Sequence, residues 1–238
     1  MKKRFLGILK VFVISIFGGL FAQQVIWPLL LQNSFFAQYK QNEAPVYVTE
    51  RSEFFIQENT ALKKAIEQVE KSVIGIRTIT QYGSVLEGSG LIITSDGLAV
   101  TLAELVPLNS DFSVYVDGLL VSAQVLKRDL AGNLALIKID QSNLHTLSFA
   151  EADKIKLGER IFLLGIVFDN GDINKVVNEG SIRFLSEDLI ETNMFDSQSL
   201  LGSPLLDIEG KFLGLNFLNL EGRVVTLPIG KIKTFTGF

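Results

Sequence analysis

Residues 88–101 read GSGLIITSDGLAVT, and this stretch carries the strongest signal for the fold of the chain. Two apolar runs, 91–93 and 98–100, surround Asp96 and Gly97, a pair that is typical of the turn of a β-hairpin. Similar turn signals recur outward from this hairpin, at Asp117-Gly118, Glu209-Gly210 and Glu221-Gly222. The repeated alternation of apolar runs and turns predicts an antiparallel β protein.

The expected strands form two sets of about six, which predicts two barrels or sandwiches. The first set is expected at residues 73–80, 85–94, 98–101, 112–116, 119–128 and 134–139. The second set is expected at residues 160–165, 175–185, 189–193, 204–207, 212–217 and 224–227. Helical spacing of apolar residues predicts a lead-in helix that begins after Asn59, and Pro228 is expected to open a short terminal helix.

Composition narrows the chemistry that the chain can perform. Hydrophobic residues make up 47% of the 238 residues and net charge is only −4, which excludes an intrinsically disordered chain. The absence of cysteine excludes disulfides, a thiol nucleophile and a thiolate zinc site. His145 is the one histidine, and its place between the two strand sets is typical of a surface or linker residue. Neither a cofactor nor a metal is therefore expected.

The N-terminal segment has the charge pattern of a membrane anchor. Three basic residues at 2–4 precede a long apolar segment, and no charge occurs between Lys10 and Lys40. About 20 apolar residues suffice to span a bilayer, so a transmembrane helix that contacts lipid through residues 5–31 is expected. The positive-inside rule then places the N-terminus in the cytoplasm and the body outside, as in a single-pass protein of a bacterial-type envelope. A signal peptide that is cleaved after Ala22 is the alternative. Leu20 would then stand three residues before the cut, at a position where signal peptidases prefer a small residue.

Charge is distributed unevenly along the chain. Residues 1–40 carry five basic and no acidic residues, which leaves 22 − 5 = 17 basic against 26 acidic residues in the remainder. An acidic body argues against nucleic-acid binding, which requires a basic surface. We expect a cytoplasmic tip and anchor over residues 1–31, a stalk over residues 32–58 and a globular domain over residues 59–238.

Four segments resemble the trypsin-like serine proteases of the HtrA/Deg family: residues 65–78, 88–101, 123–139 and 200–216. The resemblance implies an all-β, chymotrypsin-like fold of two six-stranded antiparallel barrels, at residues 59–140 and 141–238. It stops at the terminal helix, so the PDZ domain of many family members is not expected.

The positions that carry catalysis in that family differ in this sequence. By the resemblance, Glu104 stands at the position of the histidine, Asn133 at that of the aspartate and Leu201 at that of the serine nucleophile. Leucine has no attacking atom, and a serine nucleophile works only beside a suitable base. No intact triad is therefore expected.

The loop that forms the oxyanion hole also departs from the family pattern, in which the nucleophile follows a glycine and an asparagine or aspartate. Here the loop positions are Ser199, Leu200, Gly202 and Ser203. Loss of the glycine at position 199 is expected to disturb the backbone donors of the hole. Ser203 is a weaker candidate nucleophile, because using it misaligns the downstream residues.

The sequence thus predicts a membrane-anchored pseudoprotease that binds an extended peptide or unfolded protein segment in the cleft between the barrels. An active protease relative is a second candidate partner. Two alternatives stay open: an active serine endopeptidase with a non-standard nucleophile, and a purely structural module of the cell envelope. A glycosidase-like carboxylate pair, Glu104 with Asp196, has no supporting motif.

Overall fold

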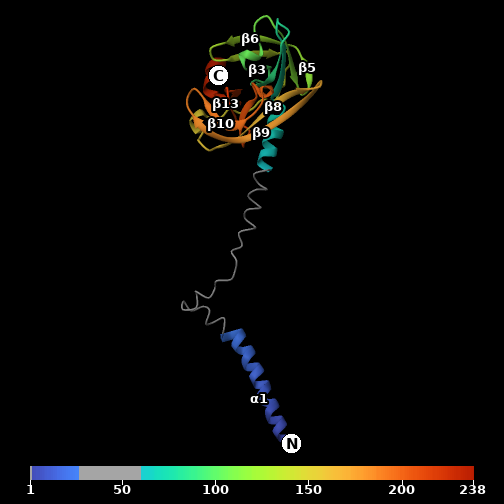
Figure 1. The fold of residues 1–238 in the computed structure, drawn as a ribbon, viewed down its shortest axis with the longest axis vertical. Helices are drawn as coiled ribbons and strands as arrows, with labels where there is room; N and C mark the ends of the chain where they lie inside the picture. Colours follow the sequence, from blue (N-terminus) through green and yellow to red (C-terminus); the bar gives the residue numbers. More distant parts are fainter. Residues whose placement is uncertain (1, 27–59) are drawn as a thin grey trace. The chain divides into compact units, whose positions relative to one another are not determined.

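The computed structural model describes residues 2–26 and 60–238, which belong to two units (Figure 1). The N-terminal unit contains α1 (Lys2–Phe21), which a π-helical turn η1 (Ala22–Ile26) continues. In these described ranges no helix is both long and apolar enough to cross a membrane. The predicted transmembrane anchor is therefore not confirmed, and the predicted stalk at 32–58 lies outside the described residues.

The first half of the globular unit is a seven-stranded antiparallel sheet in the order β5-β4-β1-β2-β3-β7-β6. A helix over residues 60–69 precedes it and buries Ala65 and Val69. The strands are β1 (Val73–Ile79), β2 (Val85–Ile92), β3 (Leu98–Thr101), β4 (Asp111–Val116), β5 (Leu119–Val121), β6 (Ala123–Asp129) and β7 (Leu134–Ile139).

This sheet corrects the prediction of a closed six-stranded first barrel. The strand expected at 119–128 is divided at Ser122 into β5 and β6. The first piece pairs with β4 and the second with β7, so the two pieces lie at opposite edges of the sheet. A strand that changes partner in this way must bend, as strands do at the corners of orthogonally packed sheets.

The second half is a closed six-stranded barrel in the order β10-β13-β12-β11-β8-β9, as the sequence predicts. Its strands are β8 (Arg160–Asp169), β9 (Asp172–Leu185), β10 (Ile190–Phe195), β11 (Pro204–Asp207), β12 (Phe212–Leu218) and β13 (Arg223–Pro228). Helix α4 (Ile229–Thr236) follows Pro228 and buries Ile229, Ile232 and Phe235.

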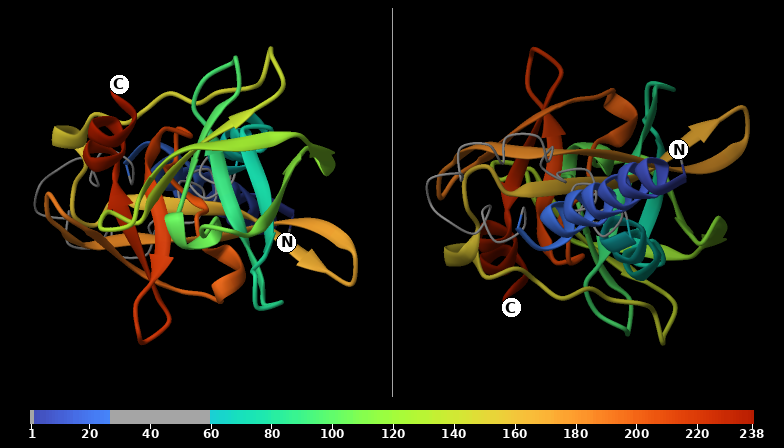
Figure 2. Two further views of the ribbon diagram at one scale, coloured as in Figure 1. Left: turned by 90° about the horizontal axis from the view of Figure 1, so that it is seen from above. Right: turned by 90° about the horizontal axis from the view of Figure 1, so that it is seen from below.

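The hairpin of β8 and β9 is longer than the sequence predicts and extends beyond the barrel, at the right-hand edge of both views in Figure 2. Asn170 and Gly171 form its two-residue turn with positive φ angles of 50° and 94°, as expected of an Asn-Gly hairpin turn. Along the hairpin, Phe168 packs edge-on against Tyr115 of β4, with ring centroids 5.3 Å apart. The hairpin therefore connects the barrel to the first sheet.

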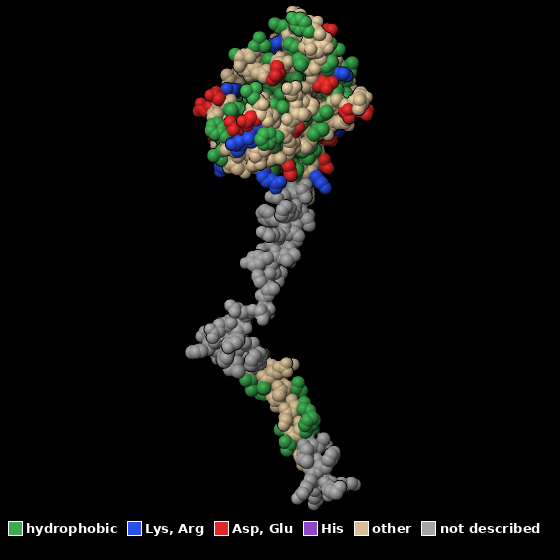
Figure 3. All heavy atoms as spheres, in the orientation of Figure 1, with side chains coloured by type: hydrophobic (Ala, Val, Ile, Leu, Met, Phe, Trp, Pro, Cys, Tyr) green, Lys and Arg blue, Asp and Glu red, His purple; other side chains and the backbone are tan. Residues whose placement is uncertain are grey.

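The surface of the globular unit carries both signs of charge. On the face drawn in Figure 3, acidic and basic side chains are interspersed over this unit. Most ion pairs of the described residues have at least one exposed partner, and in Lys211 with Glu209 and Lys231 with Asp188 both partners are exposed. Such pairs contribute little to stability, so the buried apolar residues of the two halves hold the fold together.

Candidate functional site

A cleft of about 380 Å³ lies between the first sheet and the loop that follows β10. Short 3-10 turns supply residues from both sides: η3 (Ala103–Leu105) after β3, and η5 (Gln198–Leu200) before β11. The cleft is lined by Arg77, Val85, Leu86, Glu87, Glu104, Leu105, Gln198, Ser199 and Leu201. The structure thus places Glu104 and Leu201, which are 97 residues apart (201 − 104), on the same cleft.

Glu104 and Asn133 are joined by two hydrogen bonds. The backbone N–H of Glu104 donates to Oδ1 of Asn133 at 3.1 Å, and Nδ2 of Asn133 donates to Oε1 of Glu104 at 2.7 Å. The Asn133 carbonyl accepts a third bond, from the N–H of Ala103 at 3.2 Å. Asn133 therefore fixes both the backbone and the carboxylate of Glu104.

The turn before Asn133 explains how the asparagine reaches this position. Oδ1 of Asp129 accepts hydrogen bonds from the N–H groups of Ala131 at 3.1 Å and Gly132 at 3.0 Å. Asn133 then has a left-handed backbone (φ 51°), which asparagine tolerates better than most residues. Asp129 is thus a turn residue.

Leu201 follows η5, and its backbone N–H is engaged within its own loop. This N–H donates to the carbonyl of Gln198 at 3.2 Å, and the Leu201 carbonyl accepts from the N–H of Ser89 at 2.8 Å. Gly202 comes next with a φ of 73° and donates its N–H to the Asn216 carbonyl at 2.8 Å. An oxyanion hole needs free backbone donors that point at the reacting atom, and the N–H of Leu201 points at Gln198 instead.

Neither serine of the loop contacts a base. Ser203 is fully buried, and its Oγ accepts a hydrogen bond from Nδ2 of Asn216 at 3.1 Å, while Oδ1 of Asn216 accepts from Oγ1 of Thr226 at 2.6 Å. Oγ of Ser199 lies 2.6 Å from Oγ of Ser197. A serine nucleophile requires a hydrogen-bonded base, and these contacts supply none.

The remaining predicted candidates lie elsewhere. His145 is exposed in the connection between β7 and β8. Asp196 accepts hydrogen bonds from Nδ2 of Asn178 at 2.7 Å and from the N–H of Ser197 at 2.8 Å, and it does not line the cleft. Neither residue is therefore placed to act with Glu104.

Ser89 is the residue whose importance the sequence did not reveal. Its N–H donates to Leu201, its carbonyl accepts from Oγ1 of Thr101 at 2.6 Å, and its Oγ accepts from the N–H of Ile166 on β8 at 2.8 Å. The flanking glycine makes this approach possible, since a Cβ on Gly88 would lie 2.6 Å from the Leu201 carbonyl oxygen. One buried hydroxyl and its backbone therefore join β2 both to β8 and to the loop at Leu201.

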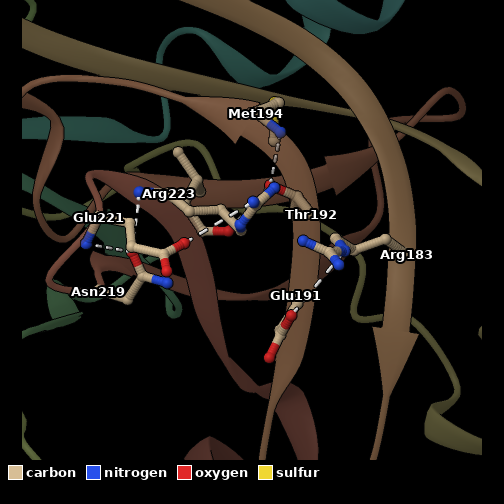
Figure 4. A network of polar contacts seen from close by, with 8 residues as sticks. Arg183, Glu191, Thr192, Met194, Asn219, Glu221 and Arg223 are labelled. Carbon is tan, nitrogen blue, oxygen red and sulfur yellow. Dashed lines mark hydrogen bonds and ion pairs between the residues drawn. The ribbon is translucent and has the colours of Figure 1, made fainter.

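Polar contacts at β10 position the start of the site loop (Figure 4). The register between β10 and β13 shifts between Glu191 and Phe195, and there the Thr192 side chain bonds to the backbone. Its Oγ1 donates to the Val224 carbonyl at 2.9 Å and accepts from the N–H of Met194 at 3.1 Å. At the end of β10, the guanidinium of Arg223 lies over the ring of Phe195 at 4.4 Å. These contacts fix the point from which the chain turns into η5.

The end of β12 has one unpaired edge. Strand β11 pairs with β12 only as far as Leu215, and the Asn216 N–H still bonds to the Ser203 carbonyl at 2.9 Å. Beyond that point Phe217 and Leu218 pair with β13 alone among the described strands. An unpaired edge of this kind can accept an added strand.

A second cavity, of about 320 Å³, shares no residue with the cleft and is lined by parts of the linker before β8 and of the turn between β11 and β12. Two of its lysines are paired with adjacent acids: Lys154 with Glu151 at 2.7 Å and Lys211 with Glu209 at 2.6 Å. This cavity therefore offers few free charges for a ligand.

Comparison with known proteins relates the chain to one group of peptidases. Residues 88–215 match the family described as the trypsin-like peptidase domain. A probable periplasmic serine endoprotease, DegP-like, from Halomonas elongata is 27% identical over 135 residues, which are 54% of this chain and 28% of that protein. Serine protease HTRA1 of Xenopus laevis is 28% identical over 160 residues, 62% of this chain and 35% of the relative. The chain thus spans about a third of the length of the curated relatives it matches.

Solved structures show the same fold. An HtrA-type protease, AlgW with tripeptide, superposes with a TM-score of 0.66 at 22% identity, over 74% of this chain and 62% of that chain. The serine endoprotease from Yersinia pestis gives the same TM-score at 20% identity, over 74% and 65% of the two chains.

Proposed function

We propose that this chain, which belongs to the trypsin-like peptidase domain family and is related to HtrA/DegP-like serine proteases, is a pseudoprotease. It would bind an extended peptide without cleaving it. The observation that carries this proposal is the content of the cleft. Leu201, which has no attacking atom, lines the cleft beside Glu104, and the amide of Asn133 holds one oxygen of that carboxylate. On this proposal the chain has lost the ability to cleave peptide bonds and keeps the cleft as a binding site.

Two further features support peptide binding. The edge of β12 beyond Asn216 is available for strand addition, and the Gly202 N–H bonds to the Asn216 carbonyl, which ties the site loop to that edge. A peptide that extends β12 would therefore run past Leu201. Backbone hydrogen bonds would supply affinity, and the residues that line the cleft would supply selectivity.

The geometry of the two loop serines does not favour the alternative of an active endopeptidase, because Ser203 is buried against Asn216 and the hydrogen-bond partner of Ser199 among the described residues is Ser197. The full chain should show no labelling by a fluorophosphonate serine probe and no turnover of unfolded casein, with an active trypsin-like protease as the positive control. Labelling at one defined serine would refute the pseudoprotease proposal.

A restoration series tests why the site is inactive. Restoring the three triad positions alone should recover little activity, because the Leu201 N–H is bonded to Gln198 and is not available to an oxyanion. Restoring the loop as well should recover more, measured as kcat/KM on a fluorogenic peptide. The triple variant is Glu104→His, Asn133→Asp and Leu201→Ser, and the six-fold variant adds Ser199→Gly, Leu200→Asn and Ser203→Gly. The six-fold variant carrying Leu201→Ala in place of Leu201→Ser is the matched control.

We also propose that the globular unit lies outside the cytoplasm. The basic residues at 2–4 that precede the apolar segment support this location, as does the description of DegP-like relatives as periplasmic. Protease added to intact spheroplasts should digest the globular unit, and its complete protection would contradict the proposal.

A further inference from the structure

The distribution of charge in the cleft bears on which peptide it accepts, and this inference rests on the proposed function. Three charged residues line the cleft: Arg77, Glu87 and Glu104. Nε of Arg77 pairs with Oε1 of Glu87 at 3.2 Å across β1 and β2, where the two residues are register partners. Glu104 forms no ion pair with any described residue, so the cleft keeps one uncompensated negative charge.

The Glu104 carboxylate is already oriented before any ligand binds. Nδ2 of Asn133 donates to Oε1 of Glu104 at 2.7 Å, and Oδ1 of Asn133 accepts from the Glu104 backbone N–H at 3.1 Å. One amide group therefore fixes both the side chain and the backbone of Glu104. A carboxylate has about four lone-pair sites, and no hydrogen bond of the described residues uses Oε2. Binding of a ligand cation to Glu104 therefore costs less conformational entropy than binding to a freely rotating carboxylate side chain.

Four of the eight other residues that line the cleft around Glu104 are apolar. Val85, Leu86, Leu105 and Leu201 line it, and Val85 is 48% exposed. Such a lining suits the aliphatic side chains that flank a charged residue in an extended segment, because alternate residues of a strand point to opposite sides.

We propose that Glu104 is a specificity residue that binds a lysine or arginine side chain of the peptide, next to apolar side chains that contact Leu201 and Leu105. Asn133 is the positioning residue for this contact. The position that resembles the family's catalytic histidine would thus select basic, apolar segments of unfolded protein. Peptides with an acidic residue at the same place would be repelled.

The experiment compares matched fluorescein-labelled peptides that bind to the full-length protein. A ten-residue peptide of alternating alanine and leucine carries one central arginine, citrulline or glutamate, since citrulline keeps the shape of arginine without its charge. Fluorescence anisotropy should show about 2- to 5-fold tighter binding of the arginine peptide than of the citrulline peptide, which is the range for one exposed ion pair. The ratio should shrink toward one at 1 M salt.

Three variants locate the source of this ratio. Glu104→Gln should abolish this ratio, so that the arginine and citrulline peptides bind with equal affinity. Asn133→Gly removes the amide but permits the positive φ of 51°, and it should lower the ratio of arginine-peptide to citrulline-peptide affinity without abolishing it. Glu221→Gln on the turn between β12 and β13, which does not line the cleft, should keep the full ratio.

The outcomes separate this inference from the function on which it rests. Equal binding of the arginine and citrulline peptides, or a ratio that survives Glu104→Gln, would overturn the role of Glu104 and leave peptide binding intact. Failure of all three peptides to bind at millimolar concentration would overturn the proposed function itself.

Discussion

Two groups of residues lie next to each other between the halves of the globular unit, and they differ in what they contribute. The junction around Ser89 is buried and joins β2 to β8 and to the Leu201 carbonyl. The cleft beside it is lined by the exposed Glu104 and the half-buried Leu201. The junction belongs to the GSG motif by which the sequence resembles its family, whereas the cleft holds Glu104 and Leu201, which the sequence analysis expects to depart from it. In the proposed pseudoprotease, residues that determine the fold are kept where residues for catalysis are replaced.

The largest effect is expected at Gly202. A Cβ there would lie 2.2 Å from the Ser89 carbonyl oxygen, on a backbone with a φ of 73°. Gly202→Ala should therefore lower the free energy of unfolding by more than about 3 kcal/mol, measured by urea denaturation.

The matched control is Gly83→Ala, since Gly83 has a similar φ of 81° but no atom within 4 Å of the added Cβ. It should cost only about 1–2 kcal/mol, the cost of the left-handed backbone alone. Equal losses in the two variants would show that the junction is not tightly packed.

A smaller loss is expected from Ser89→Ala. The substitution removes the acceptor for the Ile166 N–H and leaves that buried donor without a partner, which costs about 1–3 kcal/mol. Thermal and urea unfolding should both detect the change. Ser199→Ala, which loses only a contact with Ser197, should stay within about 0.5 kcal/mol of the parent protein.

The cleft itself should tolerate substitution with little loss of stability. Glu104 is exposed, and Glu104→Gln keeps an oxygen that can accept from Asn133. The free energy of unfolding should change by less than about 0.5 kcal/mol, while peptide selectivity changes as described above. A large loss of stability would mean that the cleft shares the structural role of the junction.

The smallest effect is expected outside both regions, at the hairpin of β2 and β3. The hydrogen bond from Lys138, and next that from Thr94, lowers the pKa of the exposed Asp96 carboxyl. A lowered folded-state pKa stabilises the fold above the unfolded pKa of about 4, and this contribution disappears as pH falls through the folded-state value. Lys138→Met should therefore differ slightly from the parent at pH 7, and the difference should shrink at about pH 2–3, as measured by thermal unfolding. A difference that grows on acidification would contradict this account.

The sequence predicted most strands of the fold because apolar runs and turn pairs are local signals. It also gave α4 with its buried Ile229, Ile232 and Phe235. The division at Ser122 was missed because a change of pairing partner leaves no mark in a continuous strand-forming run. The length of the β8–β9 hairpin was underestimated, although Asn170 and Gly171 were a usable signal.

The candidate site was accessible to sequence reasoning only where residue type decides the chemistry. Leu201 and Asn133 could be identified by resemblance, and the structure brings Asn133 into contact with Glu104. The hydrogen bond from the Leu201 N–H to Gln198 could not be foreseen, because it depends on backbone orientation within η5. The compensation of Glu87 by Arg77 was equally hidden, because it depends on the register of β1 and β2.

The bend at Ser122 has a consequence for chain topology. Because β5 and β6 lie at opposite edges of the first sheet yet are consecutive in the chain, a covalent linkage and not a hydrogen-bonded ladder connects those edges. A nick at Ser122 would therefore separate the edges without removing any strand ladder. The separated edges would be free to pair with strands of other molecules, so we expect the nicked protein to aggregate more readily than the intact chain, as measured by light scattering.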